Sequence, residues 1–253
     1  MNKYLKNLNR IEFIVTYNCT GKCKHCSIGS PSDTSSYLDK DIAGKVVFEI
    51  AEKYNIQSVM TFGGEPLLNH DCVCAIHSAA EKSGIPKRQL ITNGFFSQNP
   101  DKIKSVAEKL SKSGVNDILL SVDAFHQETI PKESVKLFAN EIQKAGLPLR
   151  LNPAWLVSKK DCNEYNKKTA EILKEFKDMG IVESNGNIVF PEGNALKYLK
   201  EYFTDQIPEN PYTENPLDLK SISIEPDGSI LGKNIYKESI IEILKEYNPS
   251  KKL

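Results

Sequence analysis

Three cysteines stand close together near the start of the chain, as Cys19, Cys23 and Cys26. The spacing C-x3-C-x2-C places three thiolates on one short loop, enough to hold three corners of a metal cluster. Structural zinc and iron–sulfur sites use four protein ligands, and no fourth cysteine or suitably spaced pair of histidines follows nearby. A [4Fe–4S] cluster here would keep one iron free of protein ligands, which favours catalysis over a structural role. A zinc site and reactive thiols are the alternative interpretations.

The cysteines follow an apolar run, residues 11–16, so their loop starts at the C-terminal end of a predicted strand. A second apolar run, residues 57–62, ends in a similar way. The residues that follow it are Gly63, Gly64, Glu65 and Pro66. Paired glycines permit a tight turn and a proline stiffens it, but a turn alone does not require the carboxylate of Glu65. Backbone carbonyls and Glu65 together could accept hydrogen bonds from a cationic amino group.

In this order, the cysteine triad and the Gly-Gly-Glu segment resemble the radical S-adenosylmethionine (radical SAM) enzymes, whose signature is C-x3-C-x-aromatic-C. His25 stands where the family has its aromatic residue. The resemblance covers roughly residues 10–200 and implies one [4Fe–4S] cluster, with S-adenosylmethionine (SAM) bound at the open iron. It also implies that His25 packs near the SAM adenine and that residues 63–66 contact the methionyl amino group. A simple surface position is the alternative for His25.

Further polar residues stand where other predicted strands end. Asn93 follows the third strand and is a candidate SAM contact, and Ser121 and Asp123 close the fourth strand. Side chains two residues apart in an extended segment point to the same side, so Ser121 and Asp123 can act on one ligand. The position of this pair resembles the ribose-contact motif of the family, which implies hydrogen bonds to the SAM ribose. Capping of the next turn is the alternative for Asp123.

Two later strands add further candidates for SAM binding. Arg150 lies on the fifth predicted strand, where its guanidinium could pair with the SAM carboxylate or form a salt bridge on the outer face. The segment at the sixth strand, residues 189–195, resembles the adenine-contact loop of the family and implies a contact at Gly193. Asn194 departs from the arginine that the family often has there.

Two residues could act on a substrate. His126 follows the ribose-contact pair, and Cys162 follows the fifth strand at the same expected end of the sheet. The histidine could face the substrate, and the thiol could donate a hydrogen atom to a substrate radical. A structural histidine and an idle thiol are the alternatives. Cys72 and Cys74 stand two residues apart on a predicted helix and do not share one face, so they do not predict a second metal site.

Apolar runs alternate with segments of helical periodicity, which is the pattern of βα units around a parallel sheet. The predicted strands are residues 11–16, 57–62, 89–92, 117–121, 147–152 and 187–190. The predicted helices include residues 39–54, 101–113, 131–145 and 163–179, and helix ends are predicted at Gly84, Gly114, Gly146 and Gly180. Six βα units predict an α/β fold, an open partial (β/α)6 barrel, which is also the core fold of the family. In such folds chemistry lies on loops at the C-terminal ends of strands, where these motifs stand.

We predict a core domain over residues 1–200 and a C-terminal extension over residues 201–253. The extension contains a proline-punctuated linker (residues 207–217), a β-hairpin about Pro226-Asp227-Gly228 and a helix over residues 237–247. It resembles a shortened SPASM or twitch extension, as found on peptide-modifying members of the family. No cysteine follows Cys162, so we expect no auxiliary cluster.

Composition limits the function classes. The chain has 253 residues and no formal net charge, with 33 basic and 33 acidic side chains. This balance argues against a dedicated nucleic-acid binder, which usually has a basic excess. The N-terminus lacks the apolar stretch of a signal peptide, and no run approaches the length of a membrane span. Six cysteines without a secretion signal predict reduced thiols and a cytoplasmic protein.

By resemblance we expect an enzyme that reductively cleaves SAM to a 5′-deoxyadenosyl radical, which abstracts hydrogen from a substrate. A peptide is the leading substrate, and a nucleotide, tRNA or small metabolite is the alternative. The family chemistry also implies a one-electron donor such as a flavodoxin or ferredoxin. A non-catalytic iron–sulfur or zinc protein is the rival from another class. Glu65 with Asp123 argues against it, because a module that only holds metal needs no SAM site.

Overall fold

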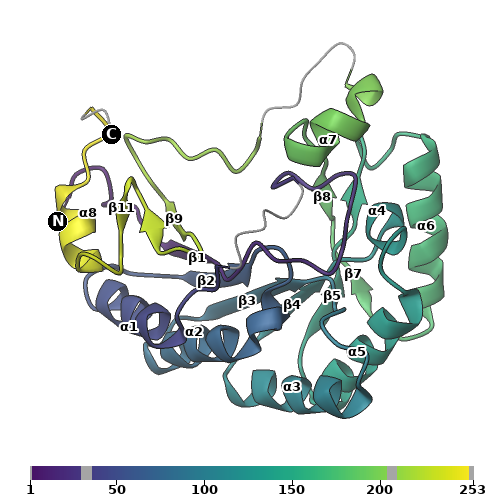
Figure 1. Cartoon of the computed structure of the whole chain (residues 1–253), viewed down its shortest axis with the longest axis horizontal. Coiled ribbons are helices and arrows are strands. Elements are labelled where there is room, and N and C mark those ends of the chain that lie inside the picture. The colour runs from purple at the N-terminus through teal and green to yellow at the C-terminus, as the bar shows by residue number, and fades with distance from the viewer. Residues whose placement is uncertain (1, 30–35, 204–209, 251–253) are drawn as a thin grey trace.

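A parallel sheet of seven strands forms the centre of the described structure (Figure 1). The structure, a computed structural model, describes residues 2–29, 36–203 and 210–250. The strand order is β7-β5-β4-β3-β2-β1-β9, and every pairing within this sheet is parallel. The strands are β1 (Arg10–Ile14), β2 (Ser58–Phe62), β3 (Lys87–Thr92), β4 (Asp117–Leu120), β5 (Leu149–Leu151), β7 (Val182–Glu183) and β9 (Ser221–Ile224). The α/β fold and the open, partial barrel are therefore confirmed.

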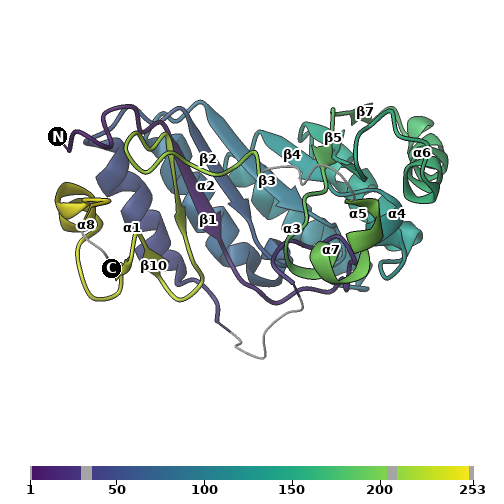
Figure 2. The same cartoon turned by 90° about the horizontal axis from the view of Figure 1, so that it is seen from above.

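Helices cover one face of this sheet and flank its β7 end (Figures 1 and 2). The long ones are α1 (Lys40–Ala51), α2 (His70–Lys82), α3 (Pro100–Lys112), α5 (Lys132–Lys144) and α6 (Glu164–Lys177). The short ones are η1 (Pro66–Asn69), α4 (Ala124–Gln127), α7 (Gly193–Tyr198), η2 (Lys200–Tyr202) and α8 (Ile240–Glu246). Two small sheets pair β6 (Ala154–Trp155) with β8 (Asn187–Ile188), and β10 (Ser229–Ile230) with β11 (Lys233–Asn234). None of the described helices is long and apolar enough to cross a membrane.

Local signals set the helix ends as the sequence predicts. Asp39 caps α1, because its side chain accepts hydrogen bonds from the backbone N–H groups of Asp41 and Ile42. The four glycines predicted at helix ends all have positive φ angles between 69° and 79°. This left-handed conformation carries a steric penalty for other residues.

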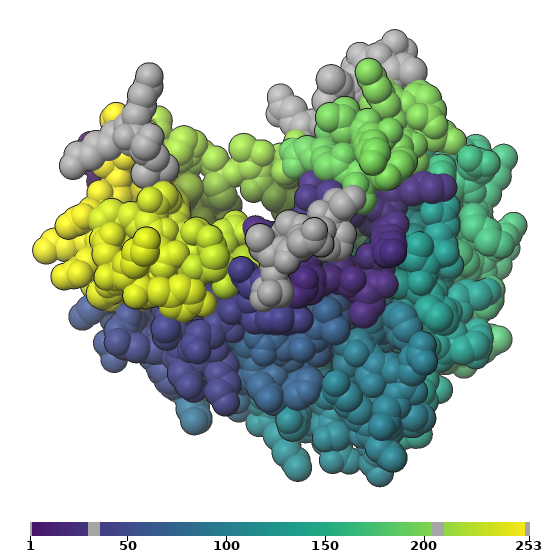
Figure 3. Space-filling model, viewed as in Figure 1, coloured from purple at the N-terminus to yellow at the C-terminus, as the bar shows by residue number. Residues whose placement is uncertain are grey.

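The two faces of the sheet differ in chemistry because side chains alternate along each strand. Ile11 and Phe13 are fully buried in the hydrophobic core against the helices. Arg10 and Glu12 project from the other face, which we call the open face, and both side chains stay partly exposed. The strand register places one row of side chains across the open face: Glu12, Met60, Gln89 and Asp117. In the space-filling view the molecule is hollowed between the elements around α8 and the region of α7 (Figure 3).

The sixth predicted strand is wrong in position. The strand that follows β5 across the central sheet is β7, at Val182–Glu183, whereas residues 187–188 pair with β6 in a separate small sheet. Val182 is 65% exposed at the edge of the central sheet. A strand this short and this exposed has no apolar run to reveal it.

The predicted hairpin is also corrected. Strand β9 joins the central sheet in parallel with β1, and the antiparallel hairpin lies one turn later, between β10 and β11. A turn does form at residues 226–228, closed by a hydrogen bond from the N–H of Gly228 to the carbonyl of Glu225. The closing helix is shorter than predicted, at Ile240–Glu246. Pro208 and the start of the predicted linker lie outside the described residues, and the domain boundary near residue 200 stays a prediction.

The cap of α1 gives a direct test of these local signals. Asp39→Ala removes the acceptor of two backbone N–H groups and should lower the free energy of unfolding by about 1 kcal/mol in urea denaturation. Asp39→Asn keeps an acceptor and should lower it by less. Equal losses in the two variants would show that the charge, not the cap, stabilises this helix end.

Candidate active site at the C-terminal ends of the strands

The first residues of the cysteine loop lie directly on the Gly63–Gly64 turn. The N–H of Gly64 donates to the carbonyl of Thr16 at 2.7 Å, and the N–H of Glu65 donates to the carbonyl of Asn18 at 2.8 Å. A Cβ atom on Gly63 would overlap the Thr16 carbonyl oxygen, and one on Gly64 would overlap that of Asn18. Gly63 also has a φ of +149°. Both positions therefore require glycine for this close approach.

The three cysteines form a set of buried or partly buried thiols. Burial raises the pKa of Cys19 to about 11. It also raises the pKa of Cys23, which the charges of Asp123, Cys19 and Cys26 raise further, so the three sulfurs lie in one electrostatic neighbourhood. No disulfide joins them, since all three are free thiols. Iron would stabilise the thiolate form that burial disfavours.

The donor set of the loop separates a cluster from a structural zinc ion. Structural zinc takes four tetrahedral protein ligands. The loop supplies three free thiols, and the ring of His25 between them packs against Phe125 and His126. Three thiolates suit a [4Fe–4S] cluster that keeps one iron free of protein ligands. The residues present therefore fit such a cluster better than a structural zinc ion.

Two asparagines hold the cysteine loop in place. The side-chain N–H2 of Asn93 donates to Thr20 Oγ1 at 3.2 Å and lies 3.7 Å from Cys19 Sγ. Asn194 donates from its backbone to the Cys26 carbonyl at 2.8 Å and from its side chain to the Cys23 carbonyl at 3.1 Å. Asn93 was predicted as a SAM contact, and Asn194 was noted only as a departure from a motif. The loop that it fixes is 168 residues away in sequence, and no local signal indicates this contact.

Gly193 lies against the same loop. A Cβ atom there would overlap the carbonyl of Ser27. The φ of Gly193 is +52°, and the residue begins α7. The structure thus brings this predicted SAM residue to the cysteines, in contact with the backbone of the loop. Its contact with adenine stays a prediction.

Glu65 is fully buried and joins the ends of two strands. Its carboxylate accepts hydrogen bonds from the N–H of Leu67 at 3.0 Å, from Thr92 Oγ1 at 2.7 Å and from the N–H of Asn93 at 2.8 Å. Burial raises the pKa of Glu65 to about 7, and these donors oppose the rise. Pro66 begins the short helix that Glu65 caps. The predicted contact with the SAM amino group stays a prediction, and the geometry adds a positioning role.

Asp123 is also fully buried, and it caps α4. Its oxygens accept from the N–H of His126 at 2.9 Å and from the N–H of Ala154 at 3.0 Å, and one lies 2.8 Å from His126 Nδ1. Burial alone would raise the pKa of Asp123, but the His126 imidazole lowers it to about 2. The capping alternative is confirmed. Ser121, which is 7% exposed, lies beside it, and the ribose contact of the pair stays a prediction.

His25 packs in an aromatic cluster at this edge of the sheet. Its ring lies 4.8 Å from the ring of Phe125 and 4.7 Å from that of His126, measured between centroids. Burial, and next the charge of His126, lower the pKa of His25 to about 4. Its Nδ1 atom is buried without a hydrogen-bond partner. His25 is thus a packed residue beside the cysteines and not a simple surface histidine.

Two predicted site residues stand apart from this cluster. Arg150 pairs with Asp117 on the open face, with Nη2 at 2.6 Å from Oδ2 and Nε at 3.0 Å from Oδ1. The salt-bridge alternative is therefore correct for Arg150, but the bridge lies on the open face of the sheet and not on the outer face. Cys162 is exposed in the turn before α6, and its Sγ lies 3.8 Å from the Lys160 carbonyl. No described interaction links either residue to the cysteines.

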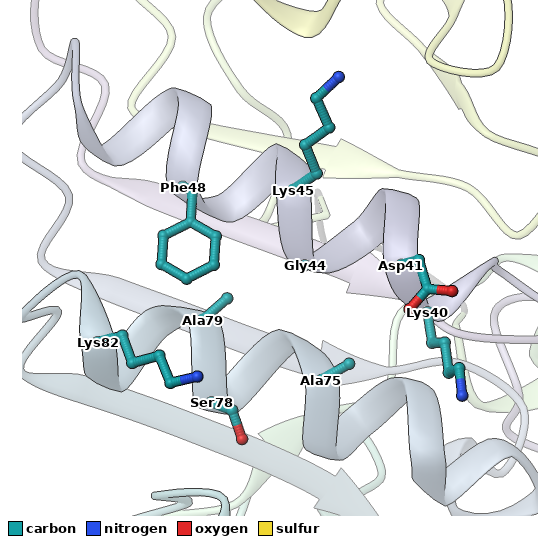
Figure 4. A pocket seen from close by; sticks show the side chains of 9 residues that line it. All are labelled: Lys40, Asp41, Gly44, Lys45, Phe48, Ala75, Ser78, Ala79 and Lys82. Atoms are coloured by element: carbon teal, nitrogen blue, oxygen red, sulfur yellow. The ribbon is translucent and has the colours of Figure 1, made fainter.

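A separate groove lies on the helix-covered side, between α1 and α2 (Figure 4). Its volume is about 430 Å³, and Phe48 and Lys82 border it from opposite helices. It contains none of the predicted site residues. We assign it no part in the chemistry.

The family description of the radical SAM superfamily matches residues 13–205. The chain belongs to the radical SAM superfamily. The family uses a [4Fe–4S] cluster and SAM, which agrees with the cysteine loop and the strand-end site described above. Recognition from the two sequence motifs is therefore confirmed.

Relatives and structural neighbours carry different names. The chain is 28% identical over 149 residues to a probable GTP 3′,8-cyclase of Methanocaldococcus jannaschii, covering 57% of this chain and 47% of that protein. It is 26% identical over 216 residues to one of Saccharolobus solfataricus, covering 80% and 67%. The chain thus spans about half to two thirds of the length of these curated relatives.

Two solved structures share the fold of this radical SAM protein. Streptococcus suis SuiB bound to SAM matches with a TM-score of 0.61 at 16% identity, over 96% of this chain and 66% of that one. The structure of anSMEcpe with bound SAM matches with a TM-score of 0.58 at 17% identity, over 95% and 81%.

The glycine contact beneath the cysteine loop gives a second prediction. Gly64→Ala places a methyl group against the Asn18 carbonyl, which should destabilise the fold by about 1–3 kcal/mol and lower the iron content after anaerobic reconstitution. Gly44→Ala, inside α1 with no atom closer than 3.7 Å, is the matched control and should stabilise the helix by up to about 1 kcal/mol. Iron content and urea denaturation measure both effects. Full iron loading in Gly64→Ala would contradict the importance of this contact.

Proposed function

We propose that this radical SAM protein cleaves SAM reductively and uses the 5′-deoxyadenosyl radical to abstract hydrogen from a peptide. When bound, the cluster and SAM supply the electron and the radical chemistry. The residues of this chain bind and orient the reactants at the C-terminal ends of the strands. A one-electron donor such as a flavodoxin or ferredoxin would reduce the cluster.

The ion pairs that the arginines already form support a peptide over a nucleoside triphosphate as the substrate. The chain has three arginines, and each pairs with a carboxylate: Arg10 with Glu12 at 2.6 Å, Arg88 with Glu81 at 3.4 Å and Arg150 with Asp117 at 2.6 Å. Proteins often bind phosphates with arginine forks. Here a triphosphate would have to take guanidinium groups from existing partners. A peptide needs only polar and apolar surface, and the open face offers Met60 and Gln89 between the paired carboxylates of Glu12 and Asp117.

For SAM itself, the geometry favours direct contact through Asn93 and Ser121. Both lie at the C-terminal ends of neighbouring strands, β3 and β4. Glu65 and Asp123 already accept several protein hydrogen bonds each and are fully buried. We therefore propose that these two carboxylates act on SAM mainly by fixing the loops around it.

A nucleotide is the second candidate, because the curated relatives are named probable GTP 3′,8-cyclases. The solved structures include SuiB bound to its precursor peptide and anSMEcpe bound to SAM and a peptide. Their identity to this chain is 15% in each case. The fold can thus present a substrate of either class, and an experiment must separate them.

Deuterium transfer separates the two substrate classes. Anaerobic protein with dithionite and SAM receives either a peptide fraction from cells grown on deuterated amino acids, or ribose-deuterated nucleotides that include GTP. We expect deuterium in 5′-deoxyadenosine with the peptides, because the radical takes its hydrogen from the substrate. Cys23→Ala is the control and should form no 5′-deoxyadenosine. Label that comes only from the nucleotides would overturn the peptide proposal in favour of the second candidate.

A further inference from the structure

We propose that His126 exchanges a proton with the substrate, with Asp123 as the positioning residue that holds its ring. This inference rests on the proposed function, since it assigns an acid–base group to the same site. It depends on three observations: the Asp123–His126 contact, the free nitrogen of His126, and the place of this pair beside the cysteine loop.

The contact fixes the ring of His126. Asp123 Oδ2 lies 2.8 Å from Nδ1 of His126, and Oδ1 accepts from the backbone N–H of the same residue at 2.9 Å. The backbone N–H of Asp123 donates to Gln127 Oε1 at 2.8 Å, and Ala154 donates to Oδ2 from a neighbouring segment. Because backbone donors from His126 and Ala154 hold the Asp123 carboxylate, the His126 ring that bonds to it has little freedom to rotate. The carboxylate also selects the tautomer in which Nδ1 carries the proton.

The other ring nitrogen, Nε2, is then the free base. No described protein group bonds to it, and it is absent from the buried atoms that lack a partner, so solvent reaches it. The side chain of His126 is 16% exposed, whereas that of Asp123 is fully buried. The pair therefore has one nitrogen held and the other accessible, which is the arrangement of a histidine that transfers protons.

The surroundings place this nitrogen in the candidate active site. The His25 ring, on the cysteine loop, contacts the His126 ring at 4.7 Å. The titratable groups around it are Asp123 on its own helix cap, His25 on the cysteine loop and Glu65 on the Gly-Gly-Glu turn. A substrate at the strand ends would meet His126 next to the SAM site.

The proposed step balances without any redox change. A proton leaves an N–H or O–H group of the substrate, its electron pair stays on that atom, and the proton joins Nε2 of His126. The carboxylate of Asp123, 2.8 Å from Nδ1, then balances the positive charge of the imidazolium. A metal ion held by His25, Asp123 and His126 would have the familiar two-histidine, one-carboxylate donor set. The oxygens of Asp123 already serve three protein donors, so we favour the proton transfer.

The tautomer is tested first, on the reconstituted holoenzyme with 15N-labelled histidine and an oxidised cluster. The chain has only four histidines, so variants can assign each ring in long-range 1H–15N spectra. We expect His126 to carry its proton on Nδ1, and Asp123→Asn to remove that preference. A wild-type ring protonated on Nε2 overturns the proposal. Titration of the same sample with zinc or ferrous ions that shifts His25 and His126 together also overturns it, in favour of a metal site.

The second test uses the deuterated peptide fraction as substrate and measures two products of the same reaction, the modified peptide and 5′-deoxyadenosine. General acid–base groups contribute about 10²–10⁴-fold to rates, so His126→Asn should lower modified peptide per 5′-deoxyadenosine by at least about tenfold. Asp123→Asn should lower the same ratio by less. A structural role would lower both products together and leave their ratio unchanged, which would overturn the proposal.

The matched control is His70→Asn. His70 pairs with Asp71 at 3.0 Å and is 18% exposed, but no described interaction links it to the cysteine loop. Its variant should keep the wild-type ratio. Absence of label transfer from peptides in the wild type would contradict the peptide substrate alone, because the tautomer is measured without substrate and still decides the role of the Asp123–His126 pair.

Discussion

The contact between the first residues of the cysteine loop and the Gly63–Gly64 turn is the constraint on which the site depends. Two backbone hydrogen bonds join the ends of β1 and β2 at a distance that no side chain permits. Glu65 follows directly and carries the connection to the end of β3 through Thr92 and the backbone of Asn93. Asn93 then returns to the loop at Thr20. Three strand ends are thus locked to one another and to the loop that carries the cysteines.

The start of α7, distant in sequence, fixes the other half of the cysteine loop. Gly193 and Asn194 lie on the second half of the loop, and Asn194 donates to the carbonyls of Cys23 and Cys26. These carbonyls belong to the backbone of the predicted cluster ligands, so their position controls where the sulfurs point. Buried backbone groups without partners would be costly. The same contacts that satisfy them therefore preorganise the loop for a cluster.

Sequence reasoning succeeded where the signal is local. Helical periodicity, the Asp39 cap and the glycines at helix ends lie within a few residues of the elements that they control, and the two motifs mark strand ends directly. It failed where partners are distant or signals weak. Val182–Glu183 is too short and exposed to show an apolar pattern, and the pairing of β9 with β1 joins segments 211 residues apart, such as Arg10 and Ser221. Arg150 could not be assigned because its partner Asp117 lies on another strand.

The carboxylates of the site show a similar limit. Their types and positions predicted polar contacts at the strand ends, and the structure does place Glu65 and Asp123 there. Sequence alone does not tell that protein donors already occupy their oxygens, because those donors come from residues 92, 93 and 154. The buried carboxylates of Glu65 and Asp123 therefore bind protein groups and fix the loops around the site. The side chain of His126, which stays 16% exposed, lies where a substrate would approach.

Electron paramagnetic resonance of the dithionite-reduced protein, recorded before and after addition of SAM, tests most directly that the cysteine loop holds one cluster with an open iron. The account predicts the signal of a single [4Fe–4S]+ cluster that changes when SAM is added, and its loss in Cys23→Ala. A cluster signal that ignores SAM, or a second cluster signal that survives in Cys23→Ala, would contradict it.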